Sequence, residues 1–172
     1  MASEGVVRIH VPCIRDVAWQ PNQRAIDRLG LAPSDTAALK EAYERSNKRV
    51  TEQLRPLCAK ALGNPDAFDA VGAGGCMDAI TNTSKKANAG AAKDALSRVA
   101  EVQAGKRAAP KDLAGAPPLE QLGLLLTGES KAFEQDLAQK LGPEEARRLA
   151  SAPELCSERR TLRTTERDDR QP

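Results

Sequence analysis

The chain has 172 residues, a net charge of +2 and an apolar fraction of 40%. This length is sufficient for one domain with its own hydrophobic core. Acidic and basic residues are interspersed, which excludes the clustered basic pattern typical of a nucleic-acid-binding protein. No apolar run approaches the roughly 20 residues that a membrane-spanning helix needs, so we expect no membrane span.

Only 2% of the residues are aromatic. The core must therefore be built from leucine, valine, isoleucine and many alanines, most of which bury less surface per side chain than aromatic residues do. Small side chains allow helices to approach one another closely. Such a core would gain stability from covalent cross-links, which raises the interest of the cysteines.

Residues 1–20 are predicted to form an extended arm. Val7, Ile9 and Val11 alternate with polar residues, which is the pattern of a short strand, and Pro12 ends it. Because one strand cannot make a sheet by itself, we expect this arm to pack on helices.

Apolar residues spaced three and four apart predict helices over most of the remaining chain, with prolines and glycines at the boundaries. The predicted helices cover residues 22–29, 33–62, 66–71, 76–104, 118–141 and 144–150. Pro56 should kink the last turn of the first long helix, because proline lacks the N–H that the helix needs there.

Residues 105–117 have the composition of a loop, and residues 157–172, charged and without apolar periodicity, that of a disordered tail. We therefore predict an all-α fold in a single domain over residues 1–156. Its architecture is an antiparallel helical bundle of three long and several short helices with an extended N-terminal arm.

Four cysteines, Cys13, Cys58, Cys76 and Cys156, bear on compartment and stability. An even number is typical of oxidising compartments, so we expect a periplasmic or extracellular protein. The N-terminus has no recognisable export signal, which means that Met1 is either the native start or follows the removal of a signal or anchor. The alternative is a cytosolic protein with four reduced, buried thiols.

The predicted bundle places Cys58, Cys76 and Cys156 at one pole, with Cys13 within reach on the arm. Of the three possible pairings we favour Cys58–Cys76 with Cys13–Cys156. Thiols gathered at one pole would also suit zinc. The chain has no Cys-x-x-Cys and no His-x-x-x-His spacing, so we predict no metal site and no cofactor.

Candidate catalytic groups are few. His10 is the one histidine, and Cys13, three residues later, need not face it on an extended arm. The glycine-rich run 72–75 precedes a helix, but it lacks the Lys-Ser/Thr of a P-loop and is better explained as helix termination. We therefore predict no catalytic residues and a protein that is not an enzyme.

The segment 122–126 carries leucines on more than one face of its predicted helix. Two interpretations are open. Either the helix is central and buried all round, or Leu122, Leu124 and Leu125 form an exposed patch that binds another protein.

Two segments resemble known bacterial proteins. Residues 29–35, LGLAPSD, with a helix ending in LRPL at 54–57, resemble the opening of the LTxxQ-motif periplasmic proteins, the small helical stress chaperones and metal-resistance sensors. Ala32 stands where that motif has Thr and Asp35 where it has Gln, and the histidines of the metal sensors are missing. Residues 133–149, with Cys156 after them, resemble uncharacterised secreted or envelope proteins of GC-rich bacteria such as myxobacteria.

The resemblance implies an envelope-stress, chaperone-like or signalling accessory role outside the cytosol. Together with the cysteines, it favours a non-enzymatic, extracytoplasmic helical domain that binds another protein, as a monomer or a homodimer. The alternative is a cytosolic helical protein that uses its thiols for metal binding or regulation.

Overall fold

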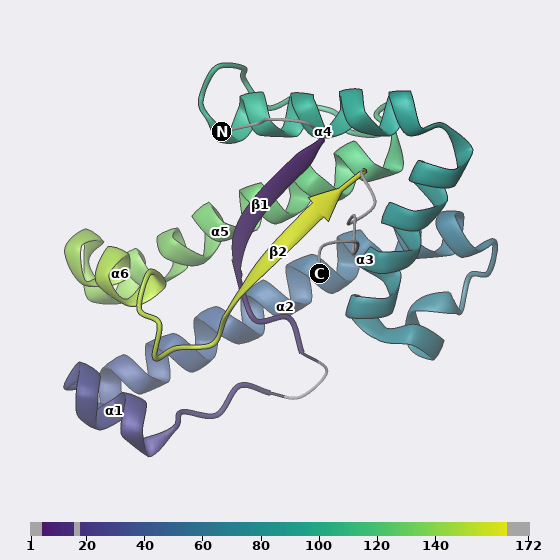
Figure 1. Ribbon diagram of the computed structural model, residues 1–172. Helices are drawn as coiled ribbons and strands as arrows, with labels where there is room; N and C mark the ends of the chain where they lie inside the picture. Colours follow the sequence, from purple (N-terminus) through teal and green to yellow (C-terminus); the bar gives the residue numbers. More distant parts are fainter. Residues whose placement is uncertain (1–4, 16–17, 165–172) are drawn as a thin grey trace, which may run out of the picture.

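The computed structural model describes residues 5–15 and 18–164, which form a mostly helical fold with one small sheet (Figure 1). In chain order the elements are β1 (Val6–Pro12), α1 (Gln23–Leu29), α2 (Pro33–Leu62), α3 (Ala67–Ala87), α4 (Ala89–Gln103), α5 (Pro118–Leu141), α6 (Pro143–Ala150) and β2 (Ser157–Arg163). Within the described ranges, no helix has both the length and the apolarity that crossing a membrane requires.

Helix α2 is the longest of these elements, and it begins and ends where the sequence predicts. Pro33 occupies its first turn, and the main-chain N–H of Ala32 donates to the carboxylate of Asp35 (2.8 Å). Gly63 ends the helix in a left-handed conformation that favours glycine. The helix continues through Pro56, whose missing N–H leaves one carbonyl without its helical partner.

Helices α2 and α5 run antiparallel and are joined by a partly buried ion network. Arg49 donates two hydrogen bonds to the carboxylate of Glu129 (3.1 and 2.6 Å) and one to Asp136 (2.7 Å). Lys140 and Glu41 form an ion pair nearer the other end of this contact (3.7 Å). Glu129 is only 3% exposed, so water solvates its carboxylate poorly. The bidentate hydrogen bonds from Arg49 compensate this buried negative charge.

Helix α5 is enclosed by α2, α3, α4, α6 and β1. Leu122, Leu124 and Leu125 are 0%, 8% and 6% exposed. These three leucines therefore do not form the exposed partner-binding patch that was one of the two expectations. Helix α5 is instead a central helix, buried on several sides. The physical reason is that β1, which crosses α5 in Figure 1, covers a face that helices alone would leave open.

Strands β1 and β2 form an antiparallel pair in which Val7 lies opposite Leu162. The all-α expectation omits this sheet, and the expectation of a disordered tail over 157–172 is wrong for Ser157–Arg163; residues 165–172 lie outside the described part. The buried face of β1 is the alternating apolar one seen in the sequence. Leu162 is the one fully buried residue within β2, so that strand shows no comparable alternation.

The long helix expected over 76–104 is two helices, α3 and α4, separated at Asn88. Asn88 has an extended main chain (φ −161°, ψ 103°), and its side chain caps α4 by accepting a hydrogen bond from the N–H of Ala91 (2.9 Å). The short helix expected over 66–71 is the first part of α3. The chain leaves the helical conformation at Gly72 (φ 69°, ψ 179°) and then resumes it.

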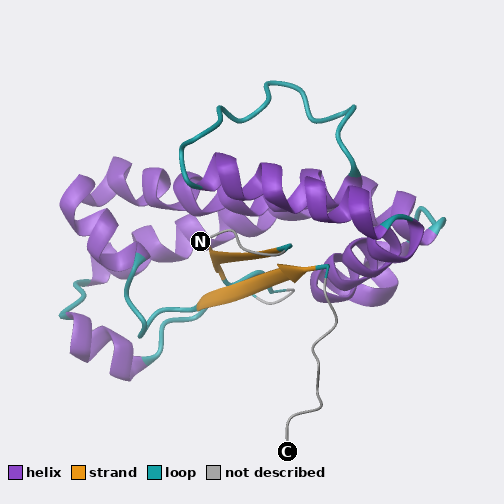
Figure 2. Cartoon of the chain, turned by 45° about the horizontal axis from the view of Figure 1, so that its top comes forward, coloured by secondary structure: helices purple, strands orange, loops and turns teal. Residues whose placement is uncertain are grey.

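The buried side chains form two clusters along α2 and α5. One combines the second half of α2, α3, α4, the first half of α5 and both strands. The other combines α1, the first half of α2, the second half of α5 and α6. Residues 104–117 join α4 to α5 as a long loop, as the sequence predicts for 105–117. Its main chain arches outward in Figure 2, and Leu113 packs against the core.

The four cysteines lie in two pairs at disulfide distance, Cys13 with Cys156 (2.08 Å) and Cys58 with Cys76 (1.94 Å). These are the two pairs favoured from the sequence. The expectation of a single pole is wrong. Cys156 accepts a hydrogen bond at its carbonyl from the hydroxyl of Tyr43 (2.9 Å), and about 22 Å of helix axis separates Tyr43 from Cys58 on α2.

Gly123 of α5 marks a close approach to α4. A Cβ atom there would lie 2.7 Å from a methyl group of Val99, whereas one at Gly128 of the same helix would meet open space. We predict that Gly123→Ala lowers the free energy of unfolding by about 1–3 kcal/mol through overpacking. Gly128→Ala should raise it by about 0.5–1 kcal/mol, because alanine is the better helix former. Urea unfolding measures both, and equal effects would contradict the close approach.

The two cysteine pairs should differ in what they contribute to stability. They close loops of very different length, with sequence separations of 143 for Cys13–Cys156 and 18 for Cys58–Cys76. By chain entropy, replacing the first pair with serines should cost about 5 kcal/mol and replacing the second about 3 kcal/mol. Denaturant unfolding of the two double variants measures both losses of unfolding free energy. A larger loss for the Cys58–Cys76 variant than for the Cys13–Cys156 variant would contradict the prediction.

Candidate functional site: a groove between α2 and α3

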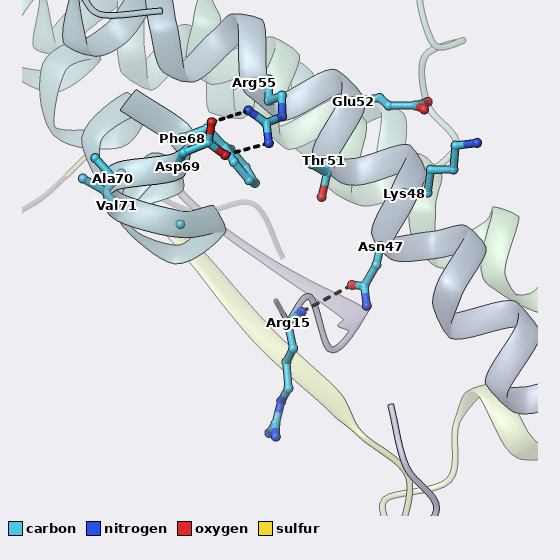
Figure 3. A pocket seen from close by; sticks show the side chains of 11 residues that line it. Arg15, Asn47, Lys48, Thr51, Glu52, Arg55, Phe68, Asp69, Ala70 and Val71 are labelled. Atoms are coloured by element: carbon cyan, nitrogen blue, oxygen red, sulfur yellow. Dashed lines mark hydrogen bonds and ion pairs between the residues drawn. The ribbon is translucent and has the colours of Figure 1, made fainter. Parts of the chain in front are cut away.

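An open groove of about 850 Å³ lies between α2 and the start of α3 (Figure 3). Its main walls are Asn47, Thr51 and Arg55 of α2 and Phe68, Asp69 and Val71 of α3. Arg15, from the segment that follows β1, borders the hollow on the third side. Three separate parts of the chain therefore meet at this groove.

The conformation of Gly72 positions the α3 wall. Its left-handed φ of 69° lets the first part of α3 cross α2 before the rest of α3 takes another direction. Cys58 and Cys76, both fully buried, join the two helices behind the groove. The side chain of Asn64 accepts a hydrogen bond from the N–H of Asp66 (2.9 Å), which shapes the turn between α2 and α3.

Arg55 and Asp69 form the principal ion pair of the groove. Two guanidinium nitrogens of Arg55 donate to the two carboxylate oxygens of Asp69 (2.9 and 2.7 Å), as the dashed lines in Figure 3 show. The same guanidinium lies 4.8 Å from the centre of the Phe68 ring, within range of a cation–π contact. The hydrogen bonds from Arg55 hold the pKa of the Asp69 carboxyl below its ordinary value.

The opposite side of the groove is more open. The main-chain N–H of Arg15 donates to the side chain of Asn47 (3.3 Å), and Figure 3 shows Thr51 pointing toward the same space. Lys48 and Glu52 lie on the rim of α2 and point away from it. The groove thus presents charges of both signs, which suits a partner of mixed charge better than a single small anion or cation.

Exposed apolar side chains also gather on this part of the fold. Among the described residues, Val71 (45% exposed) and Leu62 (44% exposed) are the large hydrophobic residues that remain open to solvent. Both lie on the α2–α3 hairpin, and Val71 forms part of the groove. Arginine and aromatic residues, which here are Arg55 and Phe68, are enriched at protein-binding surfaces.

None of these groove residues stands out in the sequence as a site. Arg55 and Asp69 are ordinary charged residues there, and nothing in their spacing indicates that they pair. The available signal is the glycine-rich run that begins at Gly72, which predicts a change of chain direction but not its angle.

A second, narrower hollow of about 380 Å³ lies beside Cys156. Tyr43 and Phe133 form its apolar wall, and the Tyr43 ring stacks on Trp19 with ring centres 4.7 Å apart. Burial raises the pKa of the Tyr43 hydroxyl. This hollow borders Cys156, and its apolar wall belongs to the core.

The candidate catalytic and metal-ligating residues do not come together. His10 is exposed on β1, and Cys13 is buried in contact with the sulfur of Cys156, so the two do not pair. Over residues 5–15 and 18–164, no group of three or more His, Cys, Asp or Glu side chains could hold a metal ion. The distance between the two cysteine pairs removes the geometry that a four-thiol zinc site would need.

Comparison with protein-family models, with curated proteins and with solved structures finds no match for this chain. The resemblance of residues 29–57 to the LTxxQ-motif proteins stays a prediction.

The Arg55–Asp69 pair gives a prediction at the groove itself. Arg55→Gln should return the lowered pKa of Asp69 toward its ordinary value, because the guanidinium hydrogen bonds are lost. Since the folded-state pKa of Asp69 is the lower one, its stabilising effect is present above the unfolded pKa and is lost as the pH falls through the folded value. NMR titration of the Asp69 carboxyl carbon measures this, with Arg45→Gln as the control. An unchanged Asp69 pKa in Arg55→Gln would contradict the pairing.

Proposed function

We propose that this chain is a disulfide-stabilised, non-enzymatic helical domain that works in the periplasm or outside the cell and binds another protein through the α2–α3 groove. The observation that carries the proposal is the arrangement of all four cysteines in two pairs at disulfide distance. Disulfides persist in oxidising compartments and are rare in the cytosol.

The compartment is supported by the places that the pairs occupy. Cys13 and Cys156 join the N-terminal strand to the C-terminal one, and Cys58 and Cys76 join α2 to α3 beneath the groove. Each pair thus cross-links two elements of a fold with few aromatic residues. Such cross-links are most useful where folding cannot rely on a large aromatic core.

Protein binding is supported by the surface of the α2–α3 hairpin. Val71 offers an apolar anchor, and Arg55, stacked on Phe68 and paired with Asp69, offers a fixed charged neighbour. Arginine and aromatic residues are enriched at the centres of binding surfaces. An envelope-stress, chaperone-like or signalling accessory role would use such a surface, and the resemblance to LTxxQ-motif proteins favours it.

The cytosolic alternative is less well supported by the geometry. A thiol-based metal site would have to use one pair at a time, because the pairs lie in different parts of the core. Both sulfurs of the Cys58–Cys76 pair belong to residues with no exposed surface. A regulatory metal ion could not reach these two sulfurs without opening the fold.

Site-specific photo-crosslinking tests the proposed partner surface. A photoreactive phenylalanine at Val71 should give a discrete cross-linked protein in the cells that naturally produce the chain, because this exposed side chain borders the groove. The matched control carries the same residue at Gln139, an exposed position on α5 away from the groove. Adding Arg55→Glu to the Val71 variant should reduce the yield.

Adducts of equal yield at both positions, or none at Val71, would argue against a protein partner at the groove. Circular dichroism of each purified variant shows whether the fold is kept, so a lost adduct is not confused with unfolding.

A further inference from the structure

The outer edge of β2 has main-chain groups that the sheet leaves unused. Two hydrogen bonds show which main-chain groups of β2 face β1. The N–H of Thr164 donates to the carbonyl of Gly5, and the N–H of Cys13 donates to the carbonyl of Cys156, each at 3.0 Å. In an antiparallel pair, residues that bond to the partner strand alternate with residues whose N–H and C=O face outward, so the even-numbered residues of β2 bond to β1. With the observed register, the outward-facing positions of β2 include 159, 161 and 163. No main-chain hydrogen bond joins them to another element of the described chain.

A groove of about 450 Å³ runs between this edge and α3. Residues 159–163 of β2 form one wall, about 13 Å long in extended conformation. Met77, Thr81 and Lys85 are among the α3 residues of the other wall, which is about 12 Å long along the helix. The two walls match in length, and together they accommodate an extended segment of about five residues.

The groove carries an excess of positive charge. Arg159, Arg160 and Arg163 lie along its β2 wall, against Asp78 on the α3 wall. Glu158 is already paired with Arg160 (2.5 Å), whose Nε is nevertheless buried without a hydrogen-bond partner. An added strand with acidic side chains would meet these arginines directly.

We propose that an extended acidic segment of another protein adds to β2 as a third strand and fills this groove. Arg159 and Arg163 lie on the same face of the sheet, because side chains alternate along a strand. The segment should therefore carry acidic residues four positions apart, with a small residue between them opposite Thr161. Main-chain hydrogen bonds supply affinity in this binding mode, and the alternate side chains supply specificity.

A second copy of the chain is the less suitable occupant of the same edge. Two-fold pairing of β2 with β2 around Thr161 would place Arg159 of each copy directly opposite Arg163 of the other. Like charges in opposed positions destabilise a pair of strands. The arginines therefore discourage self-association at this edge and select an acidic strand. This inference rests on the proposed protein-binding function but names a surface different from the α2–α3 groove.

The test uses the oxidised full chain and the fluorescent peptide Thr-Glu-Thr-Thr-Val-Glu-Thr, with a control peptide in which lysines replace both glutamates. Fluorescence anisotropy should show binding of the acidic peptide and roughly tenfold or weaker binding of the control. Thr161→Pro removes one outward-facing N–H and no bond to β1, so it should abolish binding while leaving the fold intact. Thr161→Val keeps the N–H and should bind like the wild type.

Hydrogen exchange on the unmodified chain gives a readout that needs no variant. The acidic peptide should slow exchange of the amides of Arg159, Thr161 and Arg163, and leave that of Arg15 unchanged. Equal binding of both peptides, or binding by Thr161→Pro at wild-type affinity, would overturn strand addition.

The two proposals fail separately. A Val71 cross-link that forms while the acidic peptide does not bind would overturn the third-strand proposal and leave the groove function standing. Peptide binding with no cross-link at Val71 would support strand addition and remove the α2–α3 groove as the partner surface.

Discussion

The pairing of β1 with β2, closed by Cys13 and Cys156, is the contact on which the rest of the fold depends. It brings together two segments from opposite ends of the described chain and lays the apolar face of β1 over α5. Helix α5 is buried on so many sides because this sheet completes its surroundings. The same pairing leaves one edge of β2 open, so the element that closes the core also creates a surface with unused hydrogen-bonding groups.

A core with few aromatic residues explains the other cross-link. Close contacts such as Gly123 against Val99 bring helices together without burying much surface per residue. The Cys58–Cys76 pair holds α3 against α2 at the point where Gly72 turns the chain. The groove of Figure 3 follows from that turn, because the first part of α3 is carried across α2 rather than along it.

The sequence was most informative where structure is decided locally. Helices α2, α5 and α6 follow from apolar spacing and from prolines and glycines at their ends, which act within one or two turns. The break at Asn88 was missed because the alanine-rich stretch around it is a good helix former on both sides. Strand β2 was missed because its partner is far away in the chain. The Arg55–Asp69 pair was missed because it depends on the angle of the Gly72 turn, which no spacing encodes.

The state of the four cysteines in the natural protein is the most direct test of a fold closed by two disulfides. Protein taken from the cells that make it should be denatured in the presence of the alkylating reagent, so that buried thiols also react, then digested without reduction and analysed by mass spectrometry. We predict two cross-linked peptides, one joining Cys13 to Cys156 and one joining Cys58 to Cys76, with no alkylated cysteine. Four alkylated cysteines, or a cross-link between Cys13 and Cys58, would contradict it.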